Sequence, residues 1–326
     1  MMPVPARTVR YLNRAAVEQL ALPMQRIVDE VEFALSEKAH GRSMMPAKHW
    51  METPGRWFGG MSSVVPATGY ASMKWQTGSV SNATRGLPYI TGMLFLNDIE
   101  EGVVVAVMDS TWLTQQRTAA ASAVTARYLA RPGADSFAML GCGVQARSHL
   151  EALPLVLPAL ERVVAYDIDP DAARRFAAVV EQQGLRAEVV ASARAAVEAA
   201  DVVVSSGPIA PGQPRPIQPD WLSTGALGIT LDYDCYWSAA AFAAVDLLVS
   251  DDIGQLEHIR ADGYFTDCPA PDTEIGLVVT GGHPGRTSDQ QRILALNMGV
   301  AVEDVATARA IFELAVERDA GQLLPL

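Results

Sequence analysis

The sequence predicts an α/β protein that combines a doubly wound parallel sheet with a second, α+β domain. From Ser136 onward, short apolar runs alternate with helical segments, as in parallel strands that are buried on both faces. Before residue 118, strand-like runs follow one another without helices between them. The 326 residues are enough for two domains, because single cores rarely exceed roughly 250–300 residues.

The N-terminal part is expected to begin with a helical segment and to continue with strands. Residues 15–39 place apolar side chains at broadly helical spacing, and Pro23 interrupts the pattern. Turn residues at 82–86 and 98–102 separate the later runs. The expected strands are 57–65, 70–75, 90–96 and 103–108.

The rest of the chain is expected to form the parallel sheet and a final helix. An alanine-rich helix starts at Thr118 and ends before Pro132-Gly133. A last helix from about Ala301 is expected to pack back on the first domain. The predicted domains are therefore 1–118 with 304–326, and 119–303. Within the domain 119–303 the expected strands are 136–140, 162–167, 187–190, 201–205, 226–231 and 246–250, with helices from Val144, from Pro170 and at 192–199.

Composition excludes several classes of partner. The formal net charge of −12 opposes nucleic-acid binding, which calls for a basic surface. No run of about 18 apolar residues is available to cross a membrane, and no signal peptide is recognisable. The three cysteines have neither a disulfide framework nor metal-ligand spacing, so no metal site is predicted. We expect a cytoplasmic location.

The strongest local motif is a glycine-rich turn between a buried strand and a helix. Gly141 permits the tight turn, Gly143 lets a pyrophosphate approach the backbone, and Ala146 allows close packing of helix on strand. The helix that starts at Val144-Gln145 offers free N–H groups to phosphate. The motif predicts a dinucleotide site in a Rossmann-type domain.

Asp167 is the residue expected to select the dinucleotide. It ends the next strand, about 26 residues after Gly141, where a carboxylate accepts hydrogen bonds from a ribose. A carboxylate there repels a 2′-phosphate, so NAD is favoured, while Arg174 and Arg175 keep NADP possible. The alternative is that Asp167 is only a charge near a helix N-terminus, as Asp169 before Pro170 indicates for its neighbour.

Six segments match the sequence patterns of one protein family in the same order and with the same spacing, and together they extend over nearly the whole chain. The segment Trp112–Ala123 (WLTQQRTAAASA) matches the pattern Leu-Thr-x-x-Arg-Thr-Ala-Ala-x-Ser almost position by position. In these segments the chain resembles the ornithine cyclodeaminase/μ-crystallin family. The other five matches are Tyr70–Trp75, Asn82–Gly92, Gly141–Ala146, Asp234-Cys235 and Gly299–Asp304.

The resemblance implies a substrate-binding and dimerisation domain, a Rossmann domain and a homodimer formed through the substrate domains. It also implies hydride transfer between NAD(P) and the α-carbon of an amino acid through an imine. In cyclodeaminases a side-chain amine then attacks the imine, ammonia leaves and the hydride returns. Relatives that do not cyclise their substrate are amino-acid dehydrogenases or imine reductases.

The resemblance also assigns site residues. It places the substrate carboxylate on Arg117, Lys74 and Lys48, of which Lys48 aligns with a family arginine. Asp234 aligns with the acid/base carboxylate, and Thr118 with a phosphate contact. Lys74 is a further candidate for proton transfer, because cationic neighbours lower the pKa of a lysine. The competing interpretations are that Arg117 pairs with an acid at a domain junction, that Lys74 is structural, that Lys48 is a surface lysine, and that Asp232 replaces Asp234.

The chain departs from the ornithine cyclodeaminase pattern in two places. Tyr233, Tyr236 and Trp237 surround Asp234, where that enzyme has smaller residues. Residues 57–66 contain no carboxylate for the distal ammonium of ornithine, which would cost roughly a few kcal/mol. The favoured hypothesis is therefore an NAD(P)H-dependent imine reductase or amino-acid dehydrogenase. The alternatives are a cyclodeaminase of another diamino acid and a non-catalytic cofactor-binding protein.

Overall fold

The computed structural model describes residues 7–209 and 212–326, which divide into two compact units. The first unit contains residues 1–117 and 300–326, and the second contains residues 118–299. These bounds place the junctions at Arg117 and Val300, where the sequence analysis expected residues 118 and 304.

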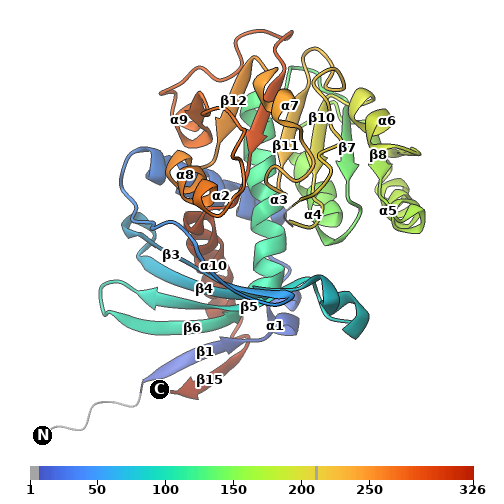
Figure 1. Ribbon diagram of the computed structural model, residues 1–326. Coiled ribbons are helices and arrows are strands. Elements are labelled where there is room, and N and C mark those ends of the chain that lie inside the picture. The colour runs from blue at the N-terminus through green and yellow to red at the C-terminus, as the bar shows by residue number, and fades with distance from the viewer. Residues whose placement is uncertain (1–6, 210–211) are drawn as a thin grey trace, which may run out of the picture. The chain divides into compact units, whose positions relative to one another are not determined.

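The first unit is built on a seven-stranded sheet with the order β15-β1-β6-β5-β4-β3-β2 (Figure 1). Strands β2 to β6 form an antiparallel meander, and β1 joins β6 in parallel. Helices and the first residues of α3 (Ser110–Leu129) complete the unit. The elements are β1 (Thr8–Leu12), α1 (Arg14–Gln19), α2 (Met24–Ala39), β2 (His49–Thr53), β3 (Arg56–Val65), β4 (Tyr70–Gly78), β5 (Ile90–Asp98), β6 (Val103–Asp109), α10 (Ala301–Glu317) and β15 (Gln322–Pro325), with short 3₁₀ helices at Pro66–Thr68 and Val80–Arg85.

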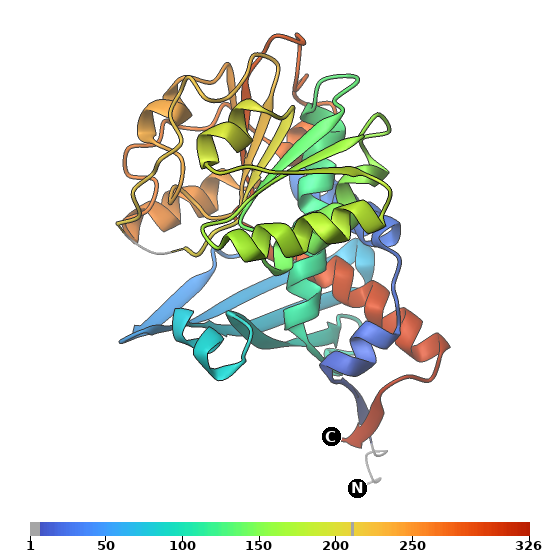
Figure 2. The same cartoon turned by 90° about the vertical axis from the view of Figure 1, so that its right-hand side faces the viewer.

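Helix α10 packs on α2 and on one face of strands β3, β4 and β5 (Figures 1 and 2). The burial pattern along β3 and β4 agrees with this arrangement. Over much of each strand every second residue is buried, as expected when one face of a sheet is covered by helices. The expected packing of the last helix on the first domain is confirmed. Strands β1 and β2 had no prediction, since their short sequences have little apolar alternation.

Helix α3 (Ser110–Leu129) begins earlier than the sequence analysis expected. The carboxylate of Asp109 accepts hydrogen bonds from the backbone N–H groups of Thr111 (3.0 Å) and Trp112 (3.1 Å), which caps the helix. The prediction of a helix start at Thr118 was therefore wrong, and Thr118 lies in the helix interior.

The second unit is a doubly wound parallel sheet with the order β13-β12-β14-β11-β10-β7-β8-β9. Figure 1 shows β12, β11, β10, β7 and β8 in this order across the sheet, and β14 lies between β12 and β11. Its elements after α3 are β7 (Ser136–Leu140), α4 (Val144–Ala152), a 3₁₀ turn (Leu153–Leu155), β8 (Arg162–Tyr166), α5 (Pro170–Gln182), β9 (Arg186–Val189), α6 (Ala193–Glu198), β10 (Val202–Ser205), β11 (Leu227–Thr230), α7 (Ala239–Ala243), β12 (Leu247–Ser250), α8 (Ile253–Ala261), β13 (Thr273–Glu274), α9 (Ile275–Val279) and β14 (Ile293–Leu296).

The predicted fold class is confirmed by this sheet. The chain runs outward from β7 to β8 and β9 and then returns to β10 on the other side of β7. Ligands of such sheets bind outside the carboxyl ends of the strands at this reversal.

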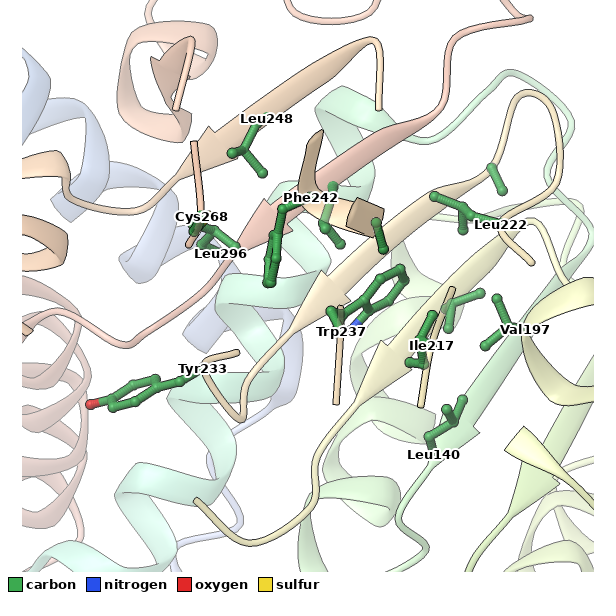
Figure 3. Close-up of a cluster of buried hydrophobic side chains, with 14 of the residues drawn as sticks. Leu140, Val197, Ile217, Leu222, Tyr233, Trp237, Phe242, Leu248, Cys268 and Leu296 are labelled. Carbon is green, nitrogen blue, oxygen red and sulfur yellow. The ribbon is translucent and has the colours of Figure 1, made fainter. Parts of the chain in front are cut away.

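An apolar cluster holds the helices and loops against the second sheet (Figure 3). Trp237 is 1% exposed, and its indole N–H donates to Ser205 Oγ over 3.0 Å, so the buried polar atom is satisfied. The cluster includes Leu140 at the end of β7 and Leu296 at the end of β14. The core therefore lies directly behind the carboxyl ends of these strands.

Candidate active site

Lys74 lies at the centre of a buried charged cluster in the first unit. It projects from β4 and is 0% exposed. Its Nζ contacts Asp304 Oδ1 at 2.7 Å, and Asp304, in the first turn of α10, is also 0% exposed. A fully buried lysine is rare unless it is paired.

Arg117, on α3, joins the same cluster. Its NH1 donates to Glu303 Oε2 over 2.7 Å, and its Nε lies 3.0 Å from Asp304 Oδ1. The structure thus brings Lys74 and Arg117 together, as the sequence analysis expected for two groups that bind one carboxylate. It also shows that Arg117 pairs with acids, which was the competing interpretation.

The cluster perturbs its own pKa values. Burial lowers the pKa of Lys74 to about 8, the nearby Asp304 carboxylate opposes that shift, and the Arg117 charge adds to it. Burial also raises the pKa of Glu303, against the attraction of Arg117. Lys74 therefore changes charge near physiological pH, where a proton-transfer group is most effective.

Lys48 directly precedes β2 and is only 4% exposed, so it is not a surface lysine. Its ammonium lies 5.5 Å from the centre of the Trp50 ring. His49 pairs with Gly60 and Met61 pairs with Lys74. Lys48 thus directly precedes a strand that lies two positions from β4, the strand of Lys74, in the order of the sheet.

The glycine-rich turn has the local geometry that a dinucleotide phosphate needs. Gly141 follows β7 with a φ of +94°, and a Cβ there would lie 2.9 Å from the carbonyl oxygen of Ser206. Gly143 precedes α4, and a Cβ there would meet no atom within 4 Å. Ala146 is fully buried where α4 approaches the sheet. These residues fit a pyrophosphate at the N-terminus of α4.

Val144 and Gln145 form the first turn of that helix. Val144 is 56% exposed. Gln145 Oε1 is buried without a hydrogen-bond partner in the described part of the chain. The imidazole of His149 is buried between the Gln145 carbonyl oxygen (2.8 Å) and Ser122 Oγ (2.9 Å), and burial lowers its pKa to about 4. His149 therefore supports the loop as an uncharged side chain.

Asp167 follows β8 and reaches the glycine-rich turn. Its Oδ2 accepts the Cys142 N–H over 2.7 Å, and its Oδ1 accepts the Asp169 N–H over 2.8 Å. A carboxylate offers about four acceptor sites, so a ribose hydroxyl can still bind. The arginines that kept NADP possible both contact acids, Arg174 through Asp171 and Arg175 through Asp169.

Thr118 contributes less than the sequence analysis expected. Because it lies inside α3, its backbone N–H belongs to the helical ladder and is no longer a free helix-terminal donor. Its hydroxyl is the remaining group of Thr118 for the contact expected from the sequence. The error arose because the alanine-rich segment hid the earlier start of the helix at Ser110.

Asp234 lies in the turn after β11 and is 1% exposed. Its Oδ2 pairs with the guanidinium of Arg215 and accepts the Phe265 N–H over 2.8 Å. Tyr233 and Phe265 have φ values of +57° and +53°, which large side chains rarely adopt. Strained backbone of this kind is found preferentially at functional sites.

The competing residue Asp232 is completely buried. Its carboxylate accepts hydrogen bonds from Ser205 Oγ (2.9 Å), Thr230 Oγ1 (2.8 Å) and the Gly207 N–H (2.9 Å). Burial raises its pKa to about 6 in spite of these bonds. Asp232 therefore fixes the carboxyl ends of β10 and β11, next to the turn that carries Asp234.

Three charged residues of these sites received no role from the sequence. Glu303 and Asp304 were visible only as matched family positions, and Arg215 gave no signal. Within the described ranges, no group of three His, Cys, Asp or Glu side chains could hold a metal ion. No helix in these ranges is long and apolar enough to cross a membrane.

Comparison with known proteins gives consistent results. The chain is 35% identical to the nodulation efficiency protein NfeD of Rhizobium meliloti, over 97% of this chain and 98% of the relative. It is 31% identical to alanine dehydrogenase of Archaeoglobus fulgidus, over 95% and 96%. In both cases the match covers nearly the full length of the two chains.

Solved structures match over the full length as well. A Thermococcus litoralis Δ¹-pyrroline-2-carboxylate reductase in complex with NADH and L-proline has a TM-score of 0.85 and 26% identity, covering 96% of this chain and 99% of that one. An archaeal alanine dehydrogenase dimer with bound NAD has a TM-score of 0.86 and 29% identity, covering 98% and 99%. Residues 9–319 match the model of one family, and the chain belongs to the ornithine cyclodeaminase/mu-crystallin family.

Proposed function

We propose that this protein is an NAD(H)-dependent oxidoreductase that interconverts an α-imino or 2-oxo acid and an α-amino acid by hydride transfer at the α-carbon. The observation that carries the proposal is one buried cluster that contains both Lys74 and Arg117. It combines a guanidinium that can bind a carboxylate with a lysine whose pKa is about 8. Alanine dehydrogenase and pyrroline-2-carboxylate reductase among the similar proteins support this reaction class.

In this proposal the first unit, predicted as residues 1–118 with 304–326, binds the substrate. Arg117 and Lys74 hold its carboxylate, and Lys48 adds a third positive charge. A planar guanidinium matches a carboxylate in geometry, which orients the α-carbon. Burial strengthens each of these contacts, because the surrounding dielectric constant is low.

The second unit, predicted as residues 119–303, binds NAD. Gly141, Gly143 and the first turn of α4 (Val144, Gln145 and Ala146) would receive the pyrophosphate, with the Thr118 hydroxyl as a further contact. Asp167 would bind the adenosine ribose. Bound NADH supplies the hydride that reduces the α-carbon.

Two residues are proposed to handle the proton. Reduction of an imine adds one hydride to carbon and one proton to nitrogen. Lys74 is a suitable donor, since its pKa is near 8. Both contacts described for Asp234 fall on Oδ2, so we propose that Oδ1 binds the substrate's amino or imino hydrogen.

Replacement of Asp167 with asparagine is expected to shift the preference from NADH toward NADPH. The substitution removes the negative charge that repels a 2′-phosphate but retains an oxygen that accepts the Cys142 N–H. The kcat/KM for NADH divided by that for NADPH should fall about tenfold or more, because close like-charge contacts cost several kcal/mol. Asp220→Asn, at an exposed aspartate that pairs with Arg194, is the control. An unchanged ratio would show that Asp167 does not face the ribose.

The homodimer is proposed from the outer face of the first sheet. Met73, Trp75, Met93 and Phe95 alternate with the buried residues of β4 and β5, and Trp75 and Phe95 are 36% and 41% exposed. Phe58 stacks on Trp75 with ring centres 6.5 Å apart. A contiguous apolar face is typical of an interface, and the archaeal alanine dehydrogenase is described as a dimer.

Phe95→Glu is therefore expected to convert a dimer into a monomer in sedimentation velocity, because two such faces would bury unpaired carboxylates. Leu323→Glu, at an exposed leucine of β15, is the control and should leave the assembly unchanged. A monomeric wild-type protein would refute this part of the proposal. The cytoplasmic location expected from the sequence stays a prediction.

The activity itself is tested by incubating the protein with NADH or NADPH. The panel contains 2-oxo acids with ammonia or methylamine, and preformed cyclic imines. Oxidation of the cofactor that depends on one imine would establish the reductase. A cyclodeaminase would instead release ammonia from a diamino acid with catalytic NAD and no net change in NADH. Binding of NADH without turnover of any substrate would favour a non-catalytic protein.

A further inference from the structure

The first turn of α10 is held rigidly beneath β3 and β4. The Ala301 N–H contacts Met45 Sδ at 3.1 Å, and Ser63 Oγ donates to the Ala301 carbonyl oxygen over 2.8 Å. Ala301, which makes both contacts, lies within one helical turn of Glu303 and Asp304. These contacts fix the backbone from which the two carboxylates project. The positive end of the helix dipole stabilises their negative charge.

The two acids of α10, Glu303 and Asp304, differ in which cations they contact. Asp304 Oδ1 contacts both Lys74 Nζ (2.7 Å) and Arg117 Nε (3.0 Å). Glu303 Oε2 contacts only Arg117, at NH1 (2.7 Å), among the contacts described. The guanidinium thus donates a hydrogen bond to Glu303 and lies within ion-pair distance of Asp304, whereas the ammonium of Lys74 donates a hydrogen bond to Asp304.

Lys74 faces few other charges. The groups that act on it electrostatically are Asp304 and Glu303 from α10 and Arg117 from α3. Its partners on the neighbouring strands, Met61 and Leu94, are uncharged. Loss of the Asp304 charge would therefore leave Lys74 with Arg117 as its nearest charged neighbour.

We infer that Asp304 and Glu303 are positioning residues, in which Asp304 holds the Lys74 ammonium charged and in place while both acids fix the Arg117 guanidinium for a substrate carboxylate. The formal charges of the four residues sum to zero, so the cluster presents oriented cations without a large buried net charge. This inference rests on the proposed function for the identity of the substrate. The state of Lys74 can be measured without any turnover.

Lysine labelling allows a direct test, because the full sequence contains only three lysines, Lys38, Lys48 and Lys74. The full-length protein is labelled with lysine carrying ¹³C at Cε, and the three signals are assigned by single Lys→Arg variants at Lys38 and Lys48. Each signal is then followed through a pH titration. In the wild type the Lys74 midpoint is expected at about 8.

In Asp304→Asn the Lys74 midpoint should fall by about 1–3 pH units, because an opposite charge in contact has been removed. Glu303→Gln should move it less. Glu30→Gln is the matched control, since Glu30 is also a buried acid paired with an arginine, Arg309, but contacts no lysine. An unchanged Lys74 midpoint in Asp304→Asn would overturn the inference.

Kinetics separate the two acids once a substrate is known. Glu303→Gln should raise KM for the carboxylate-bearing substrate and leave the pH dependence of kcat in place. Asp304→Asn should move the pH dependence of kcat to lower pH. If Asp304→Asn does not fold, as judged by circular dichroism, Glu303→Gln still decides the matter. A fall in kcat with unchanged KM in that variant would contradict the positioning role.

Discussion

Replacement of Lys74 with methionine is expected to lower kcat about 10²–10⁴-fold, which is the usual contribution of a positioned proton-transfer group. Methionine has a similar length and no charge, so the packing beneath β4 is largely retained. In the direction of imine reduction the protonated lysine is required. Wild-type kcat/KM should therefore fall as the pH rises through about 8, and this limb should be absent in Lys74→Met.

The control for this variant is Lys38→Met, on α2. It should retain wild-type kcat and the same pH dependence. Steady-state rates between pH 6 and 10, with NADH and the substrate found in the panel, provide the measurement. Retention of the alkaline limb in Lys74→Met would assign the limb to another group and would contradict proton transfer by Lys74.

Replacement of Arg117 with leucine is expected to affect both stability and substrate binding. It leaves Glu303 and Asp304 buried with Lys74 as the only cation of the cluster. Removing one partner of a buried ion pair costs about 3–5 kcal/mol in the free energy of unfolding. KM should rise in parallel, because the guanidinium that receives the substrate carboxylate is lost.

Urea unfolding followed by circular dichroism measures the first effect. Arg26→Leu is the control, since the Arg26 side chain is 51% exposed where it meets Glu30, and surface pairs contribute about 0–1 kcal/mol. Arg117→Lys should recover part of the stability but not the KM, because lysine lacks the planar fork. Full stability in Arg117→Leu would show that the ion pairs contribute little.

Much of the fold could be predicted because local sequence determines it. The strand Ser136–Leu140, its glycine turn and the helix from Val144 agree with the prediction, since each depends on a short contiguous pattern. The central strand β14 was missed. It consists of only four apolar residues, and its place between β11 and β12 depends on contacts with distant segments.

The site was predictable in its residue types but not in its pairing. A lysine in an apolar strand and an arginine before an alanine-rich helix are unusual enough to be noticed. Their partners lie 230 and 186 residues away in sequence, for Lys74–Asp304 and Arg117–Glu303. The packing of α10 on β4 brings Asp304 to Lys74, and the neighbouring Glu303 reaches Arg117 on α3.

The surroundings of Asp234 illustrate the same limit. Its place after β11 agrees with the strand predicted at 226–231. Arg215 and Phe265 reach it from two irregular loops, where no periodic pattern constrains the backbone. The left-handed backbone at Tyr233 and Phe265 could not be expected, because glycine or asparagine usually occupies such positions.

The most direct test of the proposed reaction follows the hydride itself. NADH that carries deuterium at both C4 positions is incubated with the protein and the active imine, and the amino acid formed is analysed by mass spectrometry and NMR. The account predicts one deuterium at the α-carbon for each NADH oxidised. An amino acid without deuterium at that carbon, or NADH that remains unoxidised while the product forms, would contradict hydride transfer at the α-carbon.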